Sequence, residues 1–234
     1  MPDRAEGSVA IVDYGLGNLY SVKHACESVG LQATVTSDKR ELAKARAVIL
    51  PGVGAFGEAM QSLARLDLVE PLRDVAATGI PLVGICLGMQ LLMSESQEFG
   101  RHRGLNVIEG EVVRLEGQGE ANRRLKVPQV GWNRIWHVQG DELGELSEAV
   151  GVSAWNGSLL EGVGNGAYMY FVHSFYCKPA SDDAVLSKSR YGDIIFPSTV
   201  RCGNVIGVQF HPERSGGCGL QLYRNVAASI HGLN

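Results

Sequence analysis

A cysteine between two glycines is the residue best placed to act as a nucleophile. Segment Gly84–Gly88 (GICLG) follows the apolar run Ile80–Ile85 and leads into an apolar helical segment, Leu87–Met93. It matches the G-x-S-x-G nucleophile elbow with sulfur in place of oxygen. A sharp strand-to-helix turn crowds the backbone, so side chains at the two glycines would clash. We therefore expect Cys86 at a helix N-terminus that favours a thiolate, with the backbone N–H of Leu87 as an oxyanion donor.

The alternative is that Cys86 is a buried structural thiol, because free cysteines are commonly buried. The glycine bracket and the strand–helix context favour the nucleophile. The other cysteines lack such surroundings and are interpreted as structural: Cys26, Cys177, Cys202 and Cys218. An odd number of cysteines without a C-x-x-C pair argues against a disulfide framework or a zinc site. A reducing, cytoplasmic location is expected.

A nucleophilic thiol needs a base, and the base needs an acceptor that orients it. His211 is the candidate base because the β-rich run Val205–Phe210 ends at His211-Pro212-Glu213. Parallel strands deliver active residues at their carboxyl ends, where the elbow also lies. Pro212 fixes the direction of the chain, so Glu213 can reach Nδ1 while Nε2 faces sulfur. The alternative base is His173, whose neighbours are typical of a buried strand end.

Composition excludes several classes of function. The chain has 234 residues, 45% of them hydrophobic, and a net charge of 21 − 25 = −4 without a basic run. Nucleic acid is therefore an unlikely partner. No apolar run approaches the ~20 residues that span a bilayer, and the first residues lack the apolar stretch of a signal peptide.

The elements that must position these residues alternate between strand and helix in the first part of the chain. Apolar runs at Val9–Val12, Ala47–Leu50 and Ile80–Ile85 are typical of parallel strands buried on both faces. The later part reads as short β-rich runs, and a last helix is expected at Ser215–Ile230. The pattern predicts an α/β fold, a mostly parallel doubly wound sheet with helices on both faces plus added antiparallel strands. We expect residues 1–234 to form one domain.

Several motifs together resemble the class I (triad) glutamine amidotransferases over nearly the whole chain. Within them, the chain is most similar to the glutaminase subunits of imidazole glycerol phosphate synthases. The matching segments are Asp13–Leu19 (DYGLGNL), Leu50–Phe56 (LPGVGAF), Gly84–Leu92 (GICLGMQLL), Gly131–Asn133 (GWN), Tyr170–Ser174 (YFVHS) and Gln209–Glu213 (QFHPE).

The resemblance implies a triad of Cys86, His211 and Glu213 that hydrolyses glutamine to glutamate and ammonia through a thioester. It implies a second oxyanion donor from the strand end at Gly52, Val53 and Gly54, where a plain strand-ending turn is the alternative. It also implies that the substrate glutamine is held by Gln90, Ser174 and Phe175. No metal or organic cofactor is implied.

The resemblance further implies a partner, a (β/α)8-barrel cyclase that forms a heterodimer with this chain. The cyclase uses the ammonia to make imidazole glycerol phosphate and an aminoimidazole carboxamide ribotide in histidine biosynthesis. Asn18, Trp132 and Tyr170 are expected near the junction, although either aromatic could instead lie in the core. Arg214, where lysine is usual, is expected to make a charged contact across it. A nucleotide site at Asp13–Asn18 is the weaker interpretation, because the third glycine of the fingerprint is missing.

Two departures from the family pattern leave room for a paralogue that serves a different synthase. Gln129 stands where the family commonly has histidine, and an amide cannot titrate as an imidazole does; Arg214 stands where lysine is usual. One alternative is therefore an amidotransferase subunit for another acceptor, such as a surface-polysaccharide sugar. A separate alternative is a non-catalytic regulatory scaffold. Retention of all three triad residues argues against the scaffold.

Overall fold

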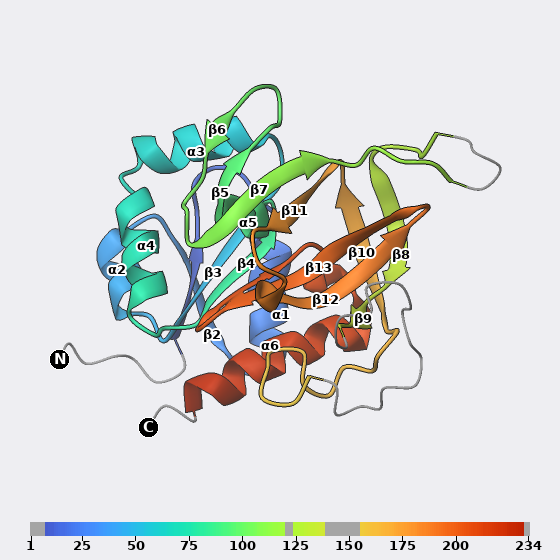
Figure 1. The fold of residues 1–234 in the computed structure, drawn as a ribbon. Coiled ribbons are helices and arrows are strands. Elements are labelled where there is room, and N and C mark those ends of the chain that lie inside the picture. Colours follow the sequence, from blue (N-terminus) through green and yellow to red (C-terminus); the bar gives the residue numbers. More distant parts are fainter. Residues whose placement is uncertain (1–7, 120–123, 139–154, 232–234) are drawn as a thin grey trace.

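The first part of the chain alternates strands and helices as expected (Figure 1). The computed structural model describes residues 8–119, 124–138 and 155–231. The elements of this part are β1 (Ser8–Val12), α1 (Leu19–Ser28), β2 (Gln32–Thr36), α2 (Lys39–Lys44), β3 (Ala47–Gly52), α3 (Phe56–Arg65), α4 (Val69–Ala77), β4 (Leu82–Cys86) and α5 (Leu87–Leu91).

The rest of the chain is mostly strand and ends in one long helix. Its elements are β5 (Met93–Ser96), β6 (His102–Arg103), β7 (Ile108–Arg114), β8 (Gln129–Arg134), β9 (Trp136–His137), β10 (Tyr168–His173), β11 (Phe175–Pro179), the 3-10 turn η2 (Asp182–Ala184), β12 (Val185–Tyr191), β13 (Ile194–Cys202), β14 (Val205–Val208), the 3-10 turn η3 (Pro212–Arg214) and α6 (Gly216–His231).

An eight-stranded sheet with the order β2-β1-β3-β4-β14-β13-β12-β9 forms the centre of the structure. Neighbours from β2 to β14 are parallel, and those from β14 to β9 are antiparallel. The predicted mostly parallel sheet with added antiparallel strands is confirmed. In the parallel part Gly52 pairs with Cys86, and Val208 pairs with Ile85. The carboxyl ends of β3, β4 and β14 therefore lie side by side, and the segments that follow them can meet.

Two smaller sheets flank this edge. One has the order β11-β7-β5-β6, and the other is the two-stranded ribbon β10-β8. The ribbon and β11 are joined through Ser174, so β10 leads from one small sheet directly into the other. This arrangement brings the chain from residue 170 to 175 past the elbow between β4 and α5 (Figure 1).

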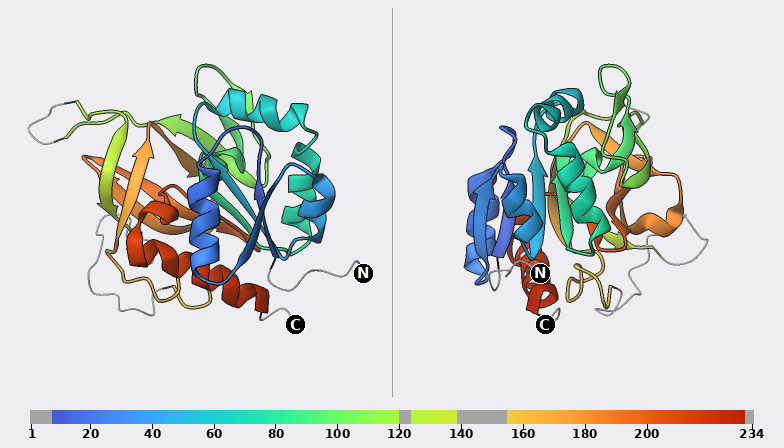
Figure 2. Two further views of the ribbon diagram at one scale, coloured as in Figure 1. Left: turned by 180° about the vertical axis from the view of Figure 1, so that it is seen from behind. Right: turned by 90° about the vertical axis from the view of Figure 1, so that its left-hand side faces the viewer.

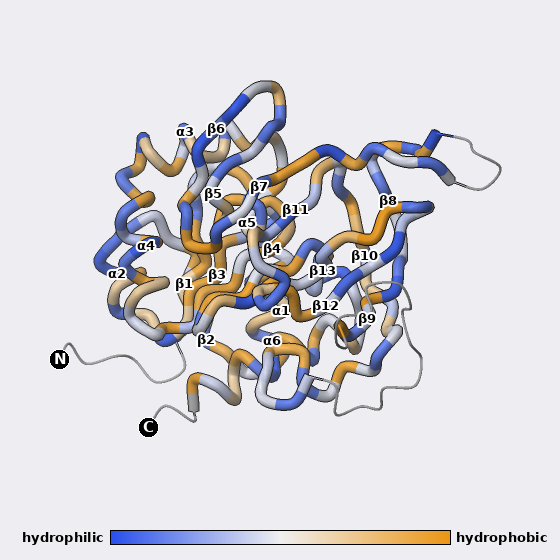
Figure 3. Tube along the Cα trace, viewed as in Figure 1, coloured by the Kyte–Doolittle hydropathy of each residue, from blue (hydrophilic) through white to orange (hydrophobic). Residues whose placement is uncertain are grey.

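The central strands separate two hydrophobic cores. Alternate residues of β1 face opposite sides, with Val9 and Ile11 in one core and Ala10 and Val12 in the other. Helices α1 and α6 cover the first core, and both stand in front of the sheet in the rear view (Figure 2). Helices α2, α3 and α4 cover the second core. Burial on both faces explains why these strands are hydrophobic along their whole length (Figure 3).

The helix after the elbow is shorter than the expected segment Leu87–Met93, since α5 ends at Leu91 and Met93 already belongs to β5. The carbonyl groups that would continue the helix are taken by other partners. The Leu91 oxygen accepts the N–H of Leu105, and the Leu92 oxygen accepts those of Val107 and Ile108. The chain therefore leaves the helix and enters β5.

The two cores lie on the two faces of one sheet, and on that ground we propose that the chain is a single domain. Among the described residues, every helix is too short or too polar to pass through a membrane.

Glycine is required at position 88 by the close approach of α5 to β3. A Cβ at Gly88 would collide with the backbone carbonyl oxygen of Leu50. We expect Gly88→Ala to lower the free energy of unfolding by at least ~3 kcal/mol, the upper range for overpacking. Gly217→Ala in α6 is the matched control, because a Cβ there meets open space, and it should stabilise the chain by ~0.5–1 kcal/mol. Urea unfolding measures both. A loss below ~1 kcal/mol for Gly88→Ala would show that α5 can move away from β3.

Candidate active site

Cys86 occupies a strained turn between β4 and α5. Its φ of 54° and ψ of −109° form a conformation that residues with a Cβ rarely adopt. A Cβ on Gly84 would lie 2.8 Å from backbone atoms of Gly88, so the turn excludes a side chain at Gly84, while the Leu50 carbonyl of β3 excludes one at Gly88. As the first residue of α5, Leu87 has no intrahelical acceptor for its N–H. The turn therefore has the shape of a nucleophile elbow, with a free backbone donor next to the sulfur.

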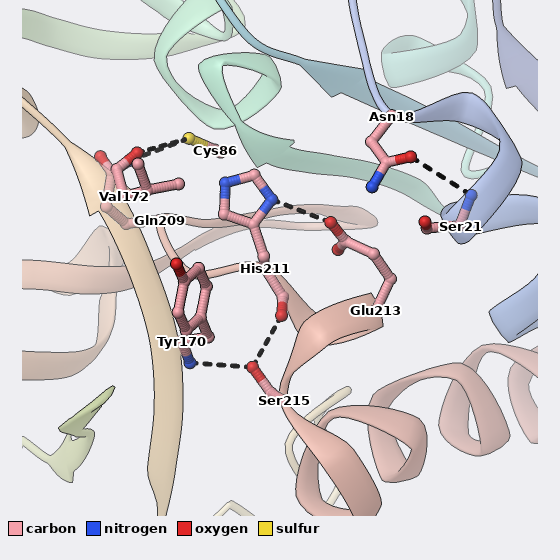
Figure 4. A network of polar contacts seen from close by, with 9 residues as sticks. All are labelled: Asn18, Ser21, Cys86, Tyr170, Val172, Gln209, His211, Glu213 and Ser215. Atoms are coloured by element: carbon pink, nitrogen blue, oxygen red, sulfur yellow. Dashed lines mark hydrogen bonds and ion pairs between the residues drawn. The ribbon is translucent and has the colours of Figure 1, made fainter. Parts of the chain in front are cut away.

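Two groups from distant segments contact the Cys86 sulfur. The Val172 carbonyl oxygen in β10 and the Gln209 side-chain nitrogen after β14 each lie 3.7 Å from Sγ. Figure 4 shows the His211 ring between the sulfur and the Glu213 carboxylate. Cys86 is only 6% exposed, so these contacts form in a largely water-free environment. The carbonyl can accept a hydrogen bond from a thiol, whereas the amide can donate one to a thiolate.

The backbone of His211 is clamped between β10 and the turn η3. Its N–H donates to the Tyr170 carbonyl oxygen at 2.8 Å, and its own carbonyl accepts from Ser215 Oγ at 2.7 Å. Ser215 Oγ also accepts the Tyr170 N–H at 3.0 Å. Pro212 begins η3, which turns the chain so that Glu213 Oε1 reaches His211 Nδ1 at 2.9 Å. The structure thus brings together the three residues that the sequence predicts as a triad.

Two neighbouring groups stabilise a positive charge on the His211 ring. Burial alone would lower the pKa of His211, but the Cys86 sulfur and the Glu213 carboxylate together raise it to about 10. The glutamate side chain is almost completely buried, so its negative charge is poorly screened by water. Among the described residues, His211 Nε2 has no conventional hydrogen-bond acceptor, and the sulfur is the group that it faces. The arrangement favours an imidazolium at His211, directly beside the sulfur of Cys86.

His173 is unsuited to act as the base. Burial, and to a smaller extent the neighbouring His211, lower the pKa of its ring to about 4, although the contact with the Phe175 carbonyl acts in the opposite direction. Its Nδ1 lies 2.9 Å from the Phe175 carbonyl oxygen, which can only accept, so the proton is on Nδ1. His173 is therefore a neutral residue of β10, as its sequence neighbours suggested.

The expected second oxyanion segment ends β3 beside the nucleophile. The Tyr14 hydroxyl donates to the Pro51 carbonyl oxygen at 2.9 Å and fills the space beside Gly52. Burial, and then the negative charge of Cys86, raise the pKa of Tyr14, so this hydroxyl stays neutral. Val53 is 42% exposed, and Gly54 has a φ of 104°. The Pro51 end of the segment is fixed, whereas the peptides around Val53 are open to solvent. Tyr14 lies within the Asp13–Leu19 motif, but its contact with Pro51 joins segments 37 positions apart and leaves no local signal in the sequence.

The residues expected to hold a substrate lie together near the sulfur. Gln90 is 5% exposed, and its side-chain nitrogen donates to the Phe175 carbonyl oxygen at 3.0 Å and to Gln209 Oε1 at 3.2 Å. The Gln90 side-chain oxygen is the atom left for a ligand. Ser174 is half-buried, and its carbonyl accepts the N–H of Leu115 at 2.9 Å. Their role in binding glutamine stays a prediction.

The residues expected at a partner junction include an exposed stack of aromatic and arginine side chains. Trp132 is 57% exposed and meets Tyr170 edge-on, with ring centroids 5.9 Å apart. The Arg214 guanidinium lies 4.5 Å from the centre of the Tyr170 ring. Asn18 is exposed and caps α1 by accepting the Ser21 N–H at 3.4 Å. Neither aromatic is a core residue.

Gln129, one of the two departures from the family pattern, is buried opposite His173. The two are paired in the β8–β10 ribbon, and Gln129 is 4% exposed. Its side-chain oxygen and His173 Nε2 both lack a hydrogen-bond partner within the described part of the chain. The residue therefore lies inside the ribbon and not on its exposed face.

Comparisons with known proteins agree on one family. The sequence pattern of the family described as glutamine amidotransferase class-I matches residues 10–227. Imidazole glycerol phosphate synthase subunit HisH of Geobacter metallireducens is 44% identical over 223 residues, which cover 95% of this chain and 98% of the relative. The same subunit of Aquifex aeolicus is 41% identical over 216 residues, 92% and 93% of the two chains.

Solved structures with the same fold are more distant in sequence. PurLQS from Thermotoga maritima superposes with a TM-score of 0.68 at 18% identity, covering 98% of this chain and 100% of the other. A crystal structure of a glutamine amidotransferase gives a TM-score of 0.66 at 21% identity, covering 94% and 98%. These likenesses show the shared fold.

The low pKa of His173 predicts an acid-labile fold. Below its unfolded pKa of about 6.5 the unfolded chain binds this proton, whereas the folded chain resists it until about pH 4. His173 should therefore remove up to ~3 kcal/mol of stability as pH falls from 6.5 to 4. We expect the stability loss caused by His173→Gln at pH 7 to shrink markedly at pH 4.5. Urea unfolding at the two pH values measures this, and an equal loss at both would mean that His173 is protonated in the folded chain.

Proposed function

The chain belongs to the class I glutamine amidotransferase family, and from this premise we propose that it hydrolyses glutamine as the glutaminase subunit of an imidazole glycerol phosphate synthase in histidine biosynthesis. The observation that carries the proposal is Cys86 in a strained elbow, facing a His211–Glu213 charge pair. Relatives over nine tenths or more of the chain carry the synthase subunit name, which favours this acceptor pathway over a sugar. The assembled triad argues against a silent scaffold.

The reaction begins with a thiolate that the site already favours. Cys86 Sγ attacks the carboxamide carbon of glutamine, and the carbonyl oxygen takes up the negative charge. The Leu87 N–H and one N–H of Gly52, Val53 or Gly54 stabilise that oxyanion. Forming the C–S bond removes one of the two anionic partners of His211 and leaves Glu213. Because the sulfur helps to raise the pKa of His211, the imidazolium becomes a stronger acid at this moment.

The proton of His211 then goes to the leaving nitrogen, the C–N bond breaks, and ammonia departs. The product is a γ-glutamyl thioester on Cys86. His211, now neutral, takes a proton from water as water attacks the thioester, and the sulfur leaves as a thiolate. The net reaction converts glutamine and water into glutamate and ammonia, and it returns the thiolate–imidazolium pair.

We propose that a docked cyclase with a (β/α)8 barrel receives the ammonia, because ammonia released into bulk water is protonated. The exposed ribbon face suits such a partner. Val130, Trp132 and Tyr168 are each more than half exposed on β8 and β10, and interfaces are enriched in aromatic residues and arginine. Asn18, Tyr170 and Arg214 complete the proposed interface. A reactive free thiol suits a reducing compartment, so we place the heterodimer in the cytoplasm.

Partner binding could also complete the oxyanion hole. Tyr14 fixes the Pro51 carbonyl, so a peptide reorientation is confined to the segment around Val53 and Gly54. Glycine makes such a change inexpensive, and contacts from a docked subunit can shift its equilibrium. A subunit gated in this way does not waste glutamine when the cyclase has no acceptor.

The triad predicts a specific order of losses in glutaminase activity. Cys86→Ala and His211→Asn should each lower kcat by several orders of magnitude, whereas Glu213→Gln should retain more activity. Replacement of an exposed thiol, Cys202→Ala, is the control and should leave turnover unchanged. Glutamate release by the chain in complex with a cyclase measures all four. Near-normal turnover by folded Cys86→Ala would end the proposal.

Gating predicts that the isolated chain is slow and that a cyclase with bound nucleotide ligand accelerates it about a thousandfold, a shift of ~4 kcal/mol in the barrier. Steady-state glutaminase kinetics with and without cyclase measure the effect. Trp132→Ala should weaken the response by raising the apparent Kd about tenfold or more. The control is Leu66→Ala, which shortens an exposed apolar side chain just after α3 and should leave the apparent Kd unchanged. An isolated chain that turns over at tens per second would contradict gating.

A further inference from the structure

The side chain of Gln209 is completely buried and bonded at both ends. Its nitrogen lies 3.7 Å from Cys86 Sγ, and its oxygen accepts a hydrogen bond from Gln90 Nε2 at 3.2 Å. Its backbone N–H donates to the Ser198 carbonyl oxygen at 2.9 Å, which fixes the residue between β13 and the elbow. Burying an amide without hydrogen-bond partners is costly. Gln209 avoids that cost through its two side-chain contacts, and one of these is with the candidate nucleophile.

The hydrogen-bond network determines which end of the Gln209 amide faces the sulfur. The Phe175 carbonyl oxygen can only accept, so the end of Gln90 that meets it at 3.0 Å must be the NH2 group. The same NH2 group meets Gln209, which must therefore accept through its oxygen. A reversed Gln209 amide would place two donors against each other. Its NH2 group is thus directed at the sulfur (Figure 4).

We propose that Gln209 is a further catalytic residue that stabilises the Cys86 thiolate by donating an N–H···S hydrogen bond, and that Gln90 is a positioning residue that holds it there. The inference rests on the proposed role of Cys86 as the nucleophile. The two sulfur contacts favour different protonation states. The Val172 carbonyl can accept only from a thiol, whereas the Gln209 amide donates most strongly to a thiolate.

The same contact helps the sulfur to leave in the second half of the reaction. A thioester sulfur carries little negative charge, so the N–H···S bond is weak in the covalent intermediate. The bond strengthens as water attacks and the C–S bond breaks, because the sulfur regains its charge. Gln209 therefore favours thiolate formation before acylation and thiolate departure during deacylation.

The other titratable groups around the sulfur allow this effect to be isolated. His211, just before η3, faces the sulfur, and Glu213 contacts the other side of its ring. His173 lies close enough to His211 to sense its charge. Tyr14 after β1 and Cys177 in β11 lie close enough to sense its charge. Burial raises the pKa of both, so they stay neutral between pH 5 and 9 and do not contribute to a titration in that range.

The test is the rate of Cys86 alkylation by iodoacetamide from pH 5 to 9 on the full chain. The exposed thiols are replaced first, as Cys202→Ser and Cys218→Ser. Gln209→Met keeps the length of the side chain and removes the donor. We expect its midpoint to rise by about one pH unit, with a roughly tenfold lower rate below the midpoint and an unchanged rate well above it. Gln209→Glu, which is nearly isosteric, should shift it at least as far. Gln90→Met should cause a smaller rise, and the exposed Gln61→Met none.

A residue that only supports the fold would lower the melting temperature without moving the midpoint. A folded Gln209→Met and Gln209→Glu with the wild-type midpoint would therefore overturn the proposal, and a Gln90→Met midpoint equal to that of wild type would overturn the positioning role. Glutaminase assays with the cyclase separate this from the function itself. If the midpoints shift but the wild-type complex releases no ammonia from glutamine, the glutaminase proposal fails while the sulfur contact stands.

Discussion

The close packing of α5 on β3 is the constraint on which the candidate site depends. Gly88 lies against the Leu50 carbonyl so closely that a single Cβ would collide with it. The helix can lie there only if the chain turns sharply at the preceding strand end, and the positive φ of Cys86 is that turn. The strain is retained because it carries the sulfur to the edge where β3, β4 and β14 end together. Gln209 and His211 follow the end of β14 at this edge, and the Val172 carbonyl of β10 reaches the sulfur from the ribbon.

Burial gives this edge its electrostatic character. An isolated buried charge is expensive, and the site supplies each charge with a partner. His211 is held as an imidazolium between a sulfur and a carboxylate, despite a burial that alone would neutralise it. His173 shows the contrast, because it is buried nearby without an anionic partner and stays neutral. Two buried histidines that lie close together thus differ in charge, because only His211 has Glu213 and Cys86 beside it.

Strand β10 connects the inside of the site with the exposed face. The ring of Tyr170 contacts Trp132 and Arg214 at the surface, and its backbone holds His211 and Ser215. Two residues later, the Val172 carbonyl contacts the sulfur. The proposed partner, docked on the aromatic ribbon, would therefore contact the same strand that holds the backbone of His211. Strand β10 and the solvent-exposed segment at Val53 would thus be two short connections between the proposed docked subunit and the groups around the Cys86 sulfur.

The sequence alone determined the features whose signals are local. Apolar runs predicted the buried parallel strands, paired glycines predicted the elbow, and His211 and Glu213 are close enough in the chain for one turn to join them. Tertiary structure decided the contacts between distant segments. Gln209 meets Cys86 across 123 positions, and Tyr14 meets Pro51 across 37. Likewise, α5 ends early because N–H groups of Leu105 and its neighbours take its carbonyls. Such hydrogen bonds depend on which strands become neighbours, and the periodicity of a sequence reports only how each segment folds by itself.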